Sequence, residues 1–208
     1  MRVVFMGTPD FAVASLSAVA EKHEVSLVVT RPDAVRGRGS ELLPSPVKAR
    51  ALELGIPVLE TKRMTPEAIE AVRQAAPDVI CVVAFGCILP DEVLEVAPLG
   101  AVNVHAPIQR SILEGDERTG VSIMRVAHEL DAGAWCRQAS VQIGEKDAAT
   151  LTAELAQLGA EELVGALPEL AAHEETWHEQ DESQVTFAAK IKKAEMRLAP
   201  AGPASANA

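Results

Sequence analysis

Asn103 and His105 stand two positions apart in an otherwise apolar stretch of the sequence. Residues two apart on a β-strand point to the same face, so an amide and an imidazole at this spacing can converge on one atom. Such a pair can stabilise an oxyanion while the imidazole moves a proton near neutral pH. A buried asparagine and histidine can equally satisfy backbone groups, and the spacing alone leaves both interpretations open.

Two further segments carry groups suited to chemistry. Asp131 lies in the turn-forming sequence Leu-Asp-Ala-Gly. It is either present because aspartate favours turn conformations, or its carboxylate orients His105. Gly7-Thr8-Pro9-Asp10 is either a plain helix start, with Thr8 as cap and Pro9 in the first turn, or a place where helix amides meet an anion or carbonyl oxygen.

Three common chemistries are excluded by missing motifs. The sequence has no G-x-G-x-x-G dinucleotide fingerprint and no G-x-S-x-G nucleophile elbow. It also lacks paired metal ligands at short spacing, so we expect no metal site.

The elements that must position these residues alternate between strands and helices. We expect strands at Arg2–Met6, Glu24–Thr30, Pro57–Leu59, Asp78–Ala84 and Ala101–His105. We expect helices from Pro9 to about Glu21, at Val47–Leu54 and at Pro66–Ala75, with a loop at 31–46. Short apolar strands that alternate with helices indicate an α/β fold, a doubly wound and mostly parallel sheet with helices on both faces. Ligands bind such sheets at the carboxyl ends of the strands, which is where Asn103 and His105 lie.

The second half of the chain follows a different pattern. After a helix that starts at Pro107, strands are expected at Val121–Val126 and Ala134–Ile143, then a long helix from about Ala148 to Ala172. Residues 199–208 consist of Ala, Pro, Gly, Ser and Asn, and we expect a disordered tail or linker there.

Composition limits the class of protein. The chain has 208 residues, is 48% hydrophobic and carries a formal net charge of −11, which argues against nucleic-acid binding over the whole surface but allows a local basic patch. Its three cysteines show no paired spacing, which fits a reducing cytoplasm. The apolar runs are too short for a signal peptide or a membrane span. We expect a cytoplasmic monomer.

Five segments together carry a family resemblance. They are MRVVFMGTPDFAV at 1–13, GRG at 37–39 with PSPVK at 44–48, VVAFGCILP at 82–90, NVHA at 103–106, and PIQRSILEGDERTGVSIM at 107–124. The chain resembles the methionyl-tRNA formyltransferases over nearly all of residues 1–198, which would form the catalytic domain. The Asn-x-His and downstream Asp alone would mark only the wider group of folate-dependent formyltransferases.

The resemblance implies a reaction and its participants. The α-amine of methionyl initiator tRNA would attack the formyl carbon of the cosubstrate 10-formyltetrahydrofolate, as part of translation initiation. Asn103 and His105 would stabilise the oxyanion, and Asp131 would hold His105 and assist proton transfer. The wall of the pteridine pocket would consist of Phe85, Cys87, Ile88 and Leu89 with His128, Glu129 and Leu130. Arg38, in a segment at 31–50 with five basic and two acidic residues, would approach the tRNA acceptor end.

The sequence departs from the family pattern in two places. A segment that follows Asn-x-His-Ala in family members, and from which folate contacts are expected, is missing where Ala106 joins Pro107. With a strand ending at His105 and a helix starting at Pro107, one residue would remain for a turn that normally needs about 2 to 6, and we therefore expect a lost loop at this junction. Family members also continue into a small β-barrel domain that helps to hold tRNA.

Two alternative functions remain open. The same three polar residues could serve formyl transfer to a small amine such as a sugar nucleotide. The chain could also be a folate- or nucleotide-binding module without turnover.

Overall fold

A computed structural model describes residues 1–35, 41–127, 129, 131–181, 183 and 191. Arg38, His128, Leu130 and the expected tail at 199–208 therefore lie outside the described residues.

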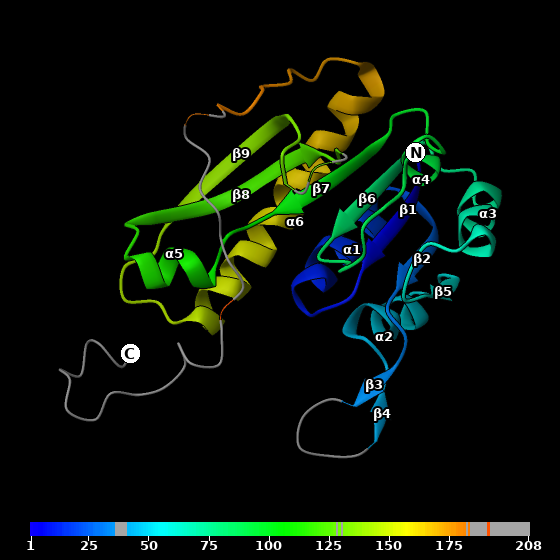
Figure 1. Ribbon diagram of the computed structural model, residues 1–208, viewed down its shortest axis with the longest axis horizontal. Coiled ribbons are helices and arrows are strands. Elements are labelled where there is room, and N and C mark those ends of the chain that lie inside the picture. The colour runs from blue at the N-terminus through cyan, green and yellow to red at the C-terminus, as the bar shows by residue number, and fades with distance from the viewer. Residues whose placement is uncertain (36–40, 128, 130, 182, 184–190, 192–208) are drawn as a thin grey trace.

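The core of the molecule is one twisted sheet (Figure 1). Within the described part of the chain it has seven strands in the order β5-β2-β1-β6-β7-β8-β9. Five neighbouring strands run parallel: β5 Val58–Glu60, β2 Glu24–Thr30, β1 Arg2–Gly7, β6 Val79–Val83 and β7 Ala101–His105. The last two, β8 Arg118–Arg125 and β9 Trp135–Gln142, are antiparallel. The expected mostly parallel sheet is confirmed.

Helices cover both faces of this sheet, as expected. Val3 and Phe5 of β1 pack on one side with α1 Phe11–Lys22, α2 Pro46–Glu53 and α6 Ala148–Ala172. Val4 and Met6 pack on the other side with α3 Pro66–Gln74 and α4 Asp91–Leu94. The two-residue alternation of strand side chains therefore divides the apolar core into two layers. Neither α6 nor any other helix among the described residues has the length and apolarity needed to cross a bilayer.

Capping side chains explain where two of the helices begin. The Ser45 hydroxyl accepts a hydrogen bond from the Lys48 amide, and the Thr65 hydroxyl accepts one from the Ala68 amide. Each cap is followed by proline in the first helical turn, and such caps contribute about 1 kcal/mol each.

The expected cap of α1 is wrong. The N-cap is Asp10, without a side-chain hydrogen bond, and the Thr8 hydroxyl donates instead to the carbonyl oxygen of Phe85 at 3.2 Å. Thr8 therefore links the end of β1 to the segment after β6.

Two further expectations are corrected. The loop at 31–46 contains an antiparallel pair, β3 Ala34–Val35 with β4 Leu42–Leu43. The helix expected from Pro107 is α5 Gln109–Glu114, because the Pro107 carbonyl accepts a hydrogen bond from the Thr119 hydroxyl at 2.7 Å and stays outside the helix. Three residues thus connect β7 to α5, a normal length, and the geometric argument for a lost loop fails.

Candidate active site

Strand β7 lies in the interior of the sheet and places Asn103 and His105 at its carboxyl end. Asn103 pairs with Val82 of β6 and Met124 of β8, and His105 pairs with Ser122 of β8. The neighbouring Val102 and Val104 are buried in the core, whereas Asn103 and His105 are only half-buried and line a cleft. The expectation that the two polar side chains share one face is confirmed.

Asp131 reaches this face from the connection between β8 and β9. Its carboxylate oxygen Oδ1 lies 3.5 Å from Nδ1 of His105. The hydrogen bond from His105 lowers the pKa of the Asp131 carboxyl, against partial burial, which raises it. A separation of 3.5 Å is long for a hydrogen bond, and such contacts in enzyme sites often shorten when a substrate binds. The structure therefore brings together the amide, imidazole and carboxylate singled out in the sequence.

A cleft of about 800 Å³ opens beside these three side chains. It falls within the size range of small-molecule sites, about 300–1,000 Å³. Of the residues expected to wall a pteridine pocket, Phe85, Cys87, Ile88, Leu89 and Glu129 line it. His128 and Leu130 belong to the part of the chain that the structure leaves undescribed.

The wall after β6 is shaped by an unusual backbone. Ala84 and Gly86 both have positive φ, at 48° and 76°, and Phe85 between them is only 2% exposed. The Arg31 guanidinium donates to the Gly86 carbonyl at 2.9 Å, and the Thr8 hydroxyl donates to that of Phe85. Left-handed backbone at a non-glycine residue costs about 1–3 kcal/mol and persists only where neighbouring contacts hold it.

The cleft has further lining residues, some of which the sequence analysis missed. Pro9 and Asp10, at the start of α1, belong to the segment already considered for ligand binding, and they line the cleft. Gln109, Arg125 and Thr152 also line it but were not singled out. Arg125 is the last residue of β8, so a search of all strand ends near β7 could have found it. Gln109 begins α5 and Thr152 lies on α6, and neither position carries such a signal in the sequence.

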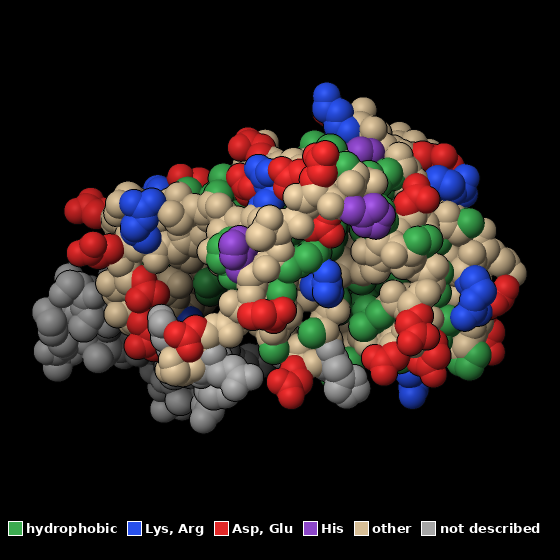
Figure 2. Space-filling view, turned by 90° about the horizontal axis from the view of Figure 1, so that it is seen from above, with side chains coloured by type: hydrophobic (Ala, Val, Ile, Leu, Met, Phe, Trp, Pro, Cys, Tyr) green, Lys and Arg blue, Asp and Glu red, His purple; other side chains and the backbone are tan. Residues whose placement is uncertain are grey.

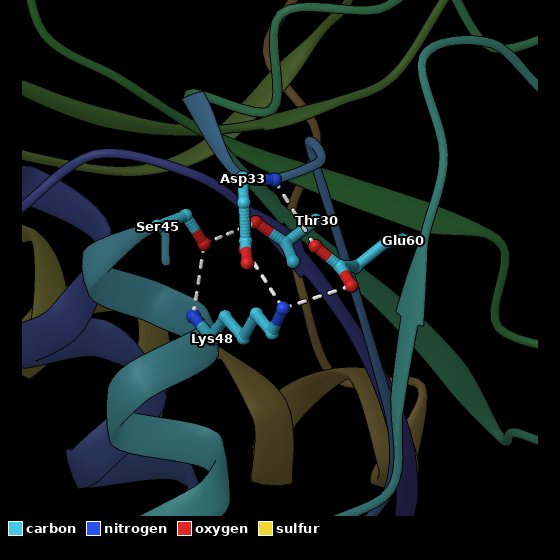
Figure 3. A network of polar contacts seen from close by, with 5 residues as sticks. All are labelled: Thr30, Asp33, Ser45, Lys48 and Glu60. Atoms are coloured by element: carbon cyan, nitrogen blue, oxygen red, sulfur yellow. Dashed lines mark hydrogen bonds and ion pairs between the residues drawn. The ribbon is translucent and has the colours of Figure 1, made fainter. Parts of the chain in front are cut away.

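The basic segment at 31–50 is largely engaged within the fold. The Lys48 ammonium contacts Asp33 at 2.7 Å and Glu60 at 2.9 Å, while Ser45 shares a hydrogen bond with Thr30 (Figure 3). The hydrogen bond to Asp33, and to a lesser extent the one to Glu60, raises the pKa of the Lys48 ammonium. Arg50 pairs with Glu53 at 2.9 Å.

A doubly wound sheet with an amide, an imidazole and a carboxylate at its carboxyl edge defines an α/β enzyme equipped to stabilise an oxyanion and to move a proton. The chain belongs to the formyl transferase family: the family model described as "Formyl transferase" matches residues 1–167.

Relatives of known name share much of the sequence. The methionyl-tRNA formyltransferase of Methylococcus capsulatus is 48% identical over 211 residues, which cover 95% of this chain and 68% of that protein. The protein of the same name from Methylobacillus flagellatus is 46% identical, covering 94% of this chain and 68% of that protein.

Solved structures share the fold. The phosphoribosylglycinamide formyltransferase of Anaplasma phagocytophilum superposes with a TM-score of 0.67 at 21% identity, covering 88% of this chain and 95% of that chain. HypX from Aquifex aeolicus superposes with a TM-score of 0.72 at 17% identity over all of this chain and 33% of its own. At these identities the likeness concerns the fold alone.

The alignment with a third relative is longer than this chain, which concerns the segment expected to be missing after Ala106. The methionyl-tRNA formyltransferase of Thiobacillus denitrificans, 45% identical, aligns over 222 positions and covers 100% of this chain of 208 residues and 71% of its own length. About 14 of those positions therefore have no counterpart in this chain. The difference supports the prediction that an internal segment of the relatives is missing here.

Proposed function

We propose that this chain transfers a formyl group from 10-formyltetrahydrofolate to the amino group of methionyl initiator tRNA, in cytoplasmic translation initiation. The observation that carries the proposal is the 48% identity to a methionyl-tRNA formyltransferase across 95% of the chain. The proposed catalytic domain is residues 1–198. Its proposed catalytic residues are Asn103, His105 and Asp131, which line one cleft.

The cleft suits the proposed cosubstrate, which supplies an activated formyl carbonyl. A flat heterocycle needs a largely apolar slot with a few polar groups at its mouth. Buried Phe85 and Leu89 offer the apolar wall, and Glu129 offers a polar group. Cys87 and Ile88 complete the wall, and we assign His128 and Leu130 to it from the family resemblance. Ile88 is 83% exposed and would be covered by a bound ligand.

The three polar side chains have separate proposed roles. The Asn103 amide donates a hydrogen bond to the oxyanion that develops from the formyl oxygen. His105 takes the proton of the attacking amine, donates it as an imidazolium toward the same oxygen, and returns it to the folate nitrogen as the bond between that nitrogen and the formyl carbon breaks, which releases tetrahydrofolate. Asp131, whose pKa is lowered by the hydrogen bond from His105, stays ionised and orients the ring through Nδ1. Loss of one oxyanion donor in other enzymes lowers kcat by roughly 10² to 10³.

We assign the tRNA acceptor end to the segment that contains Arg38, between β3 and β4 in the sequence. One guanidinium at this place can pair with a phosphate in a bidentate manner.

A formylation assay tests the function. Purified chain is incubated with 10-formyltetrahydrofolate and, separately, with methionyl initiator tRNA and with an amino-sugar nucleotide. We expect formyl-methionyl-tRNA as product, and a loss of roughly 10² to 10⁴ in kcat for His105→Ala. Gln157→Ala, exposed on α6 away from the cleft, is the matched control.

Other outcomes would assign other functions. Formylation of the sugar nucleotide alone would replace the tRNA substrate by a small amine. Folate binding by calorimetry without any turnover, unchanged in His105→Ala, would make the chain a binding module.

A further inference from the structure

The segment that follows α6 returns to the sheet and packs beside the turn that carries Asp131. His178 and Trp135 of β9 exchange backbone hydrogen bonds of 3.0 and 2.8 Å, and their rings stack at 4.4 Å. Arg125, at the end of β8, lies 4.3 Å over the ring of Trp177. These contacts fix residues 177–180 against the β8–β9 pair. This segment lies beyond residues 1–167, the range that the family model matches.

Gln180 uses its side-chain amide on this turn. Nε2 donates to the carbonyl oxygen of Asp131 at 2.8 Å and to that of Gly133 at 2.9 Å. One amide has two N–H groups, so both of its donors are engaged. Gln180 therefore joins the two ends of the sequence Asp131-Ala132-Gly133.

The turn needs such support because its backbone is strained. Asp131 has a φ of 54°, in the left-handed region that non-glycine residues adopt at a cost of about 1–3 kcal/mol. On its other side the turn meets β8: a Cβ added to Gly133 would lie 1.9 Å from the Arg125 carbonyl oxygen. The Asp131 turn is thus held between the Arg125 backbone and the Gln180 amide.

We propose that Gln180 is a positioning residue for the formyl-transfer reaction: it fixes the turn from which the Asp131 carboxylate reaches Nδ1 of His105. The inference rests on the proposed function for its reaction, and on the contacts of Gln180 for its geometry. Gln180 lies outside the proposed catalytic trio and acts through Asp131. A displacement of about 1 Å at an active site can lower turnover by roughly 100-fold, so a loosened turn has a measurable effect.

The imidazole tautomer reports this geometry directly. A carboxylate beside Nδ1 favours the tautomer with the proton on Nδ1, which leaves Nε2 as the acceptor. Among the described residues, the other charged groups that line the same cleft are Asp10, Arg125 and Glu129. Both hydrogen bonds described for Gln180 go to the Asp131 turn, and neither goes to Asp10, Arg125 or Glu129.

The test compares two substitutions of the same kind in the full chain. Gln180→Met keeps the length of the side chain and removes both donors without adding charge. Gln157→Met makes the same change on α6, where the Gln157 side-chain amide donates a hydrogen bond to the exposed Glu161 at 3.2 Å. The readouts are the ¹⁵N chemical shifts of the His105 ring, kcat for methionyl-tRNA, and KM for the tRNA. Circular dichroism checks that each variant is folded.

We expect Gln180→Met to shift the His105 ring from the Nδ1–H tautomer toward a mixture and to lower kcat roughly 10- to 100-fold at unchanged KM. Gln157→Met should match wild type in all three. An unchanged His105 spectrum in folded Gln180→Met, or an equal shift in both variants, would overturn the positioning role. If wild type shows no turnover but Gln180→Met still shifts the His105 tautomer, the positioning role is supported and the proposed function is rejected.

Discussion

Asp131 combines a strained backbone with a favourable side-chain contact. Its backbone is left-handed, and its carboxylate faces an imidazole at 3.5 Å. Strained residues of this kind cluster at functional sites, where surrounding contacts hold them. The lowered pKa of the carboxyl means that the folded protein favours the ionised form.

This pKa shift gives the stability of the protein a defined pH dependence. A carboxyl whose pKa is lowered on folding stabilises the fold above its ordinary value, about 3.9, and this contribution is lost as the pH falls through the lowered pKa. We expect Asp131→Asn to be less stable than wild type at pH 5 to 6, and we expect the difference to shrink as the pH falls through the lowered pKa of Asp131. Asparagine tolerates left-handed backbone, so the comparison isolates the charge.

Urea unfolding at a series of pH values measures this difference. Asp116→Asn, in the exposed connection between α5 and β8, is the control and should follow wild type throughout. A stability difference for Asp131→Asn that persists unchanged at pH 2 would contradict the electrostatic explanation.

At the residue scale, the sequence predicted what strand periodicity determines and little more. Asn103 and His105 share a face because they are two apart on a strand. Thr8 was taken for a helix cap because its type and position suit one, but its hydroxyl donates instead to the carbonyl oxygen of Phe85, in the segment after β6. The contacts of Gln180 with the Asp131 turn join residues 47 and 49 positions apart, and no local pattern predicts them.

At the scale of elements, apolar segments with clear boundaries were the best predicted. The bounds expected for β7 and α6 agree with the structure, since Gly100 precedes β7 and an Asp147 cap begins α6. The β3–β4 pair was missed because two-residue strands carry no periodic signal, and Val35 and Leu42 within it are exposed rather than core residues. The start of α5 was misplaced because the hydrogen bond of Thr119 to Pro107 depends on tertiary contact.

The ion pairs of Lys48 join α2 to the end of β5 and to Asp33, which immediately precedes β3. We therefore expect Lys48→Met to loosen the β3–β4 pair. The substitution leaves the carboxylates of Asp33 and Glu60 close together without their shared cation. The Asp33 amide, which donates to Glu60 Oε1 at 3.1 Å, should exchange its hydrogen faster, and Tm should fall. Hydrogen exchange by NMR and calorimetry measure the two effects.

Lys22→Met, exposed at the end of α1, is the control for loss of one positive charge. Equal exchange rates for Asp33 in Lys48→Met and wild type would show that the ion pairs do not hold this segment.

At the scale of the whole molecule, charge opposes the proposed partner. The net charge is −11, and Figure 2 shows acidic side chains spread over the face in view with basic ones between them. Of the five basic residues at 31–50, Arg31 contacts backbone carbonyls and Lys48 and Arg50 form ion pairs. Arg36 and Arg38 lie outside the described residues, and we propose these two for phosphate contact.

This charge distribution predicts a weak dependence of tRNA binding on salt. Each phosphate neutralised contributes about −0.7 to −0.9 to the slope of log K against log salt concentration, so two contacts give a slope of roughly −1.4 to −1.8. Filter binding of initiator tRNA measures the slope over a series of salt concentrations between about 50 and 300 mM, each about twice the one before. Arg38→Ala should reduce its magnitude by about 1, whereas Arg73→Ala, on α3 and paired with Glu70, should leave it unchanged. A wild-type slope near −6 would show that basic side chains elsewhere on this acidic molecule carry the binding.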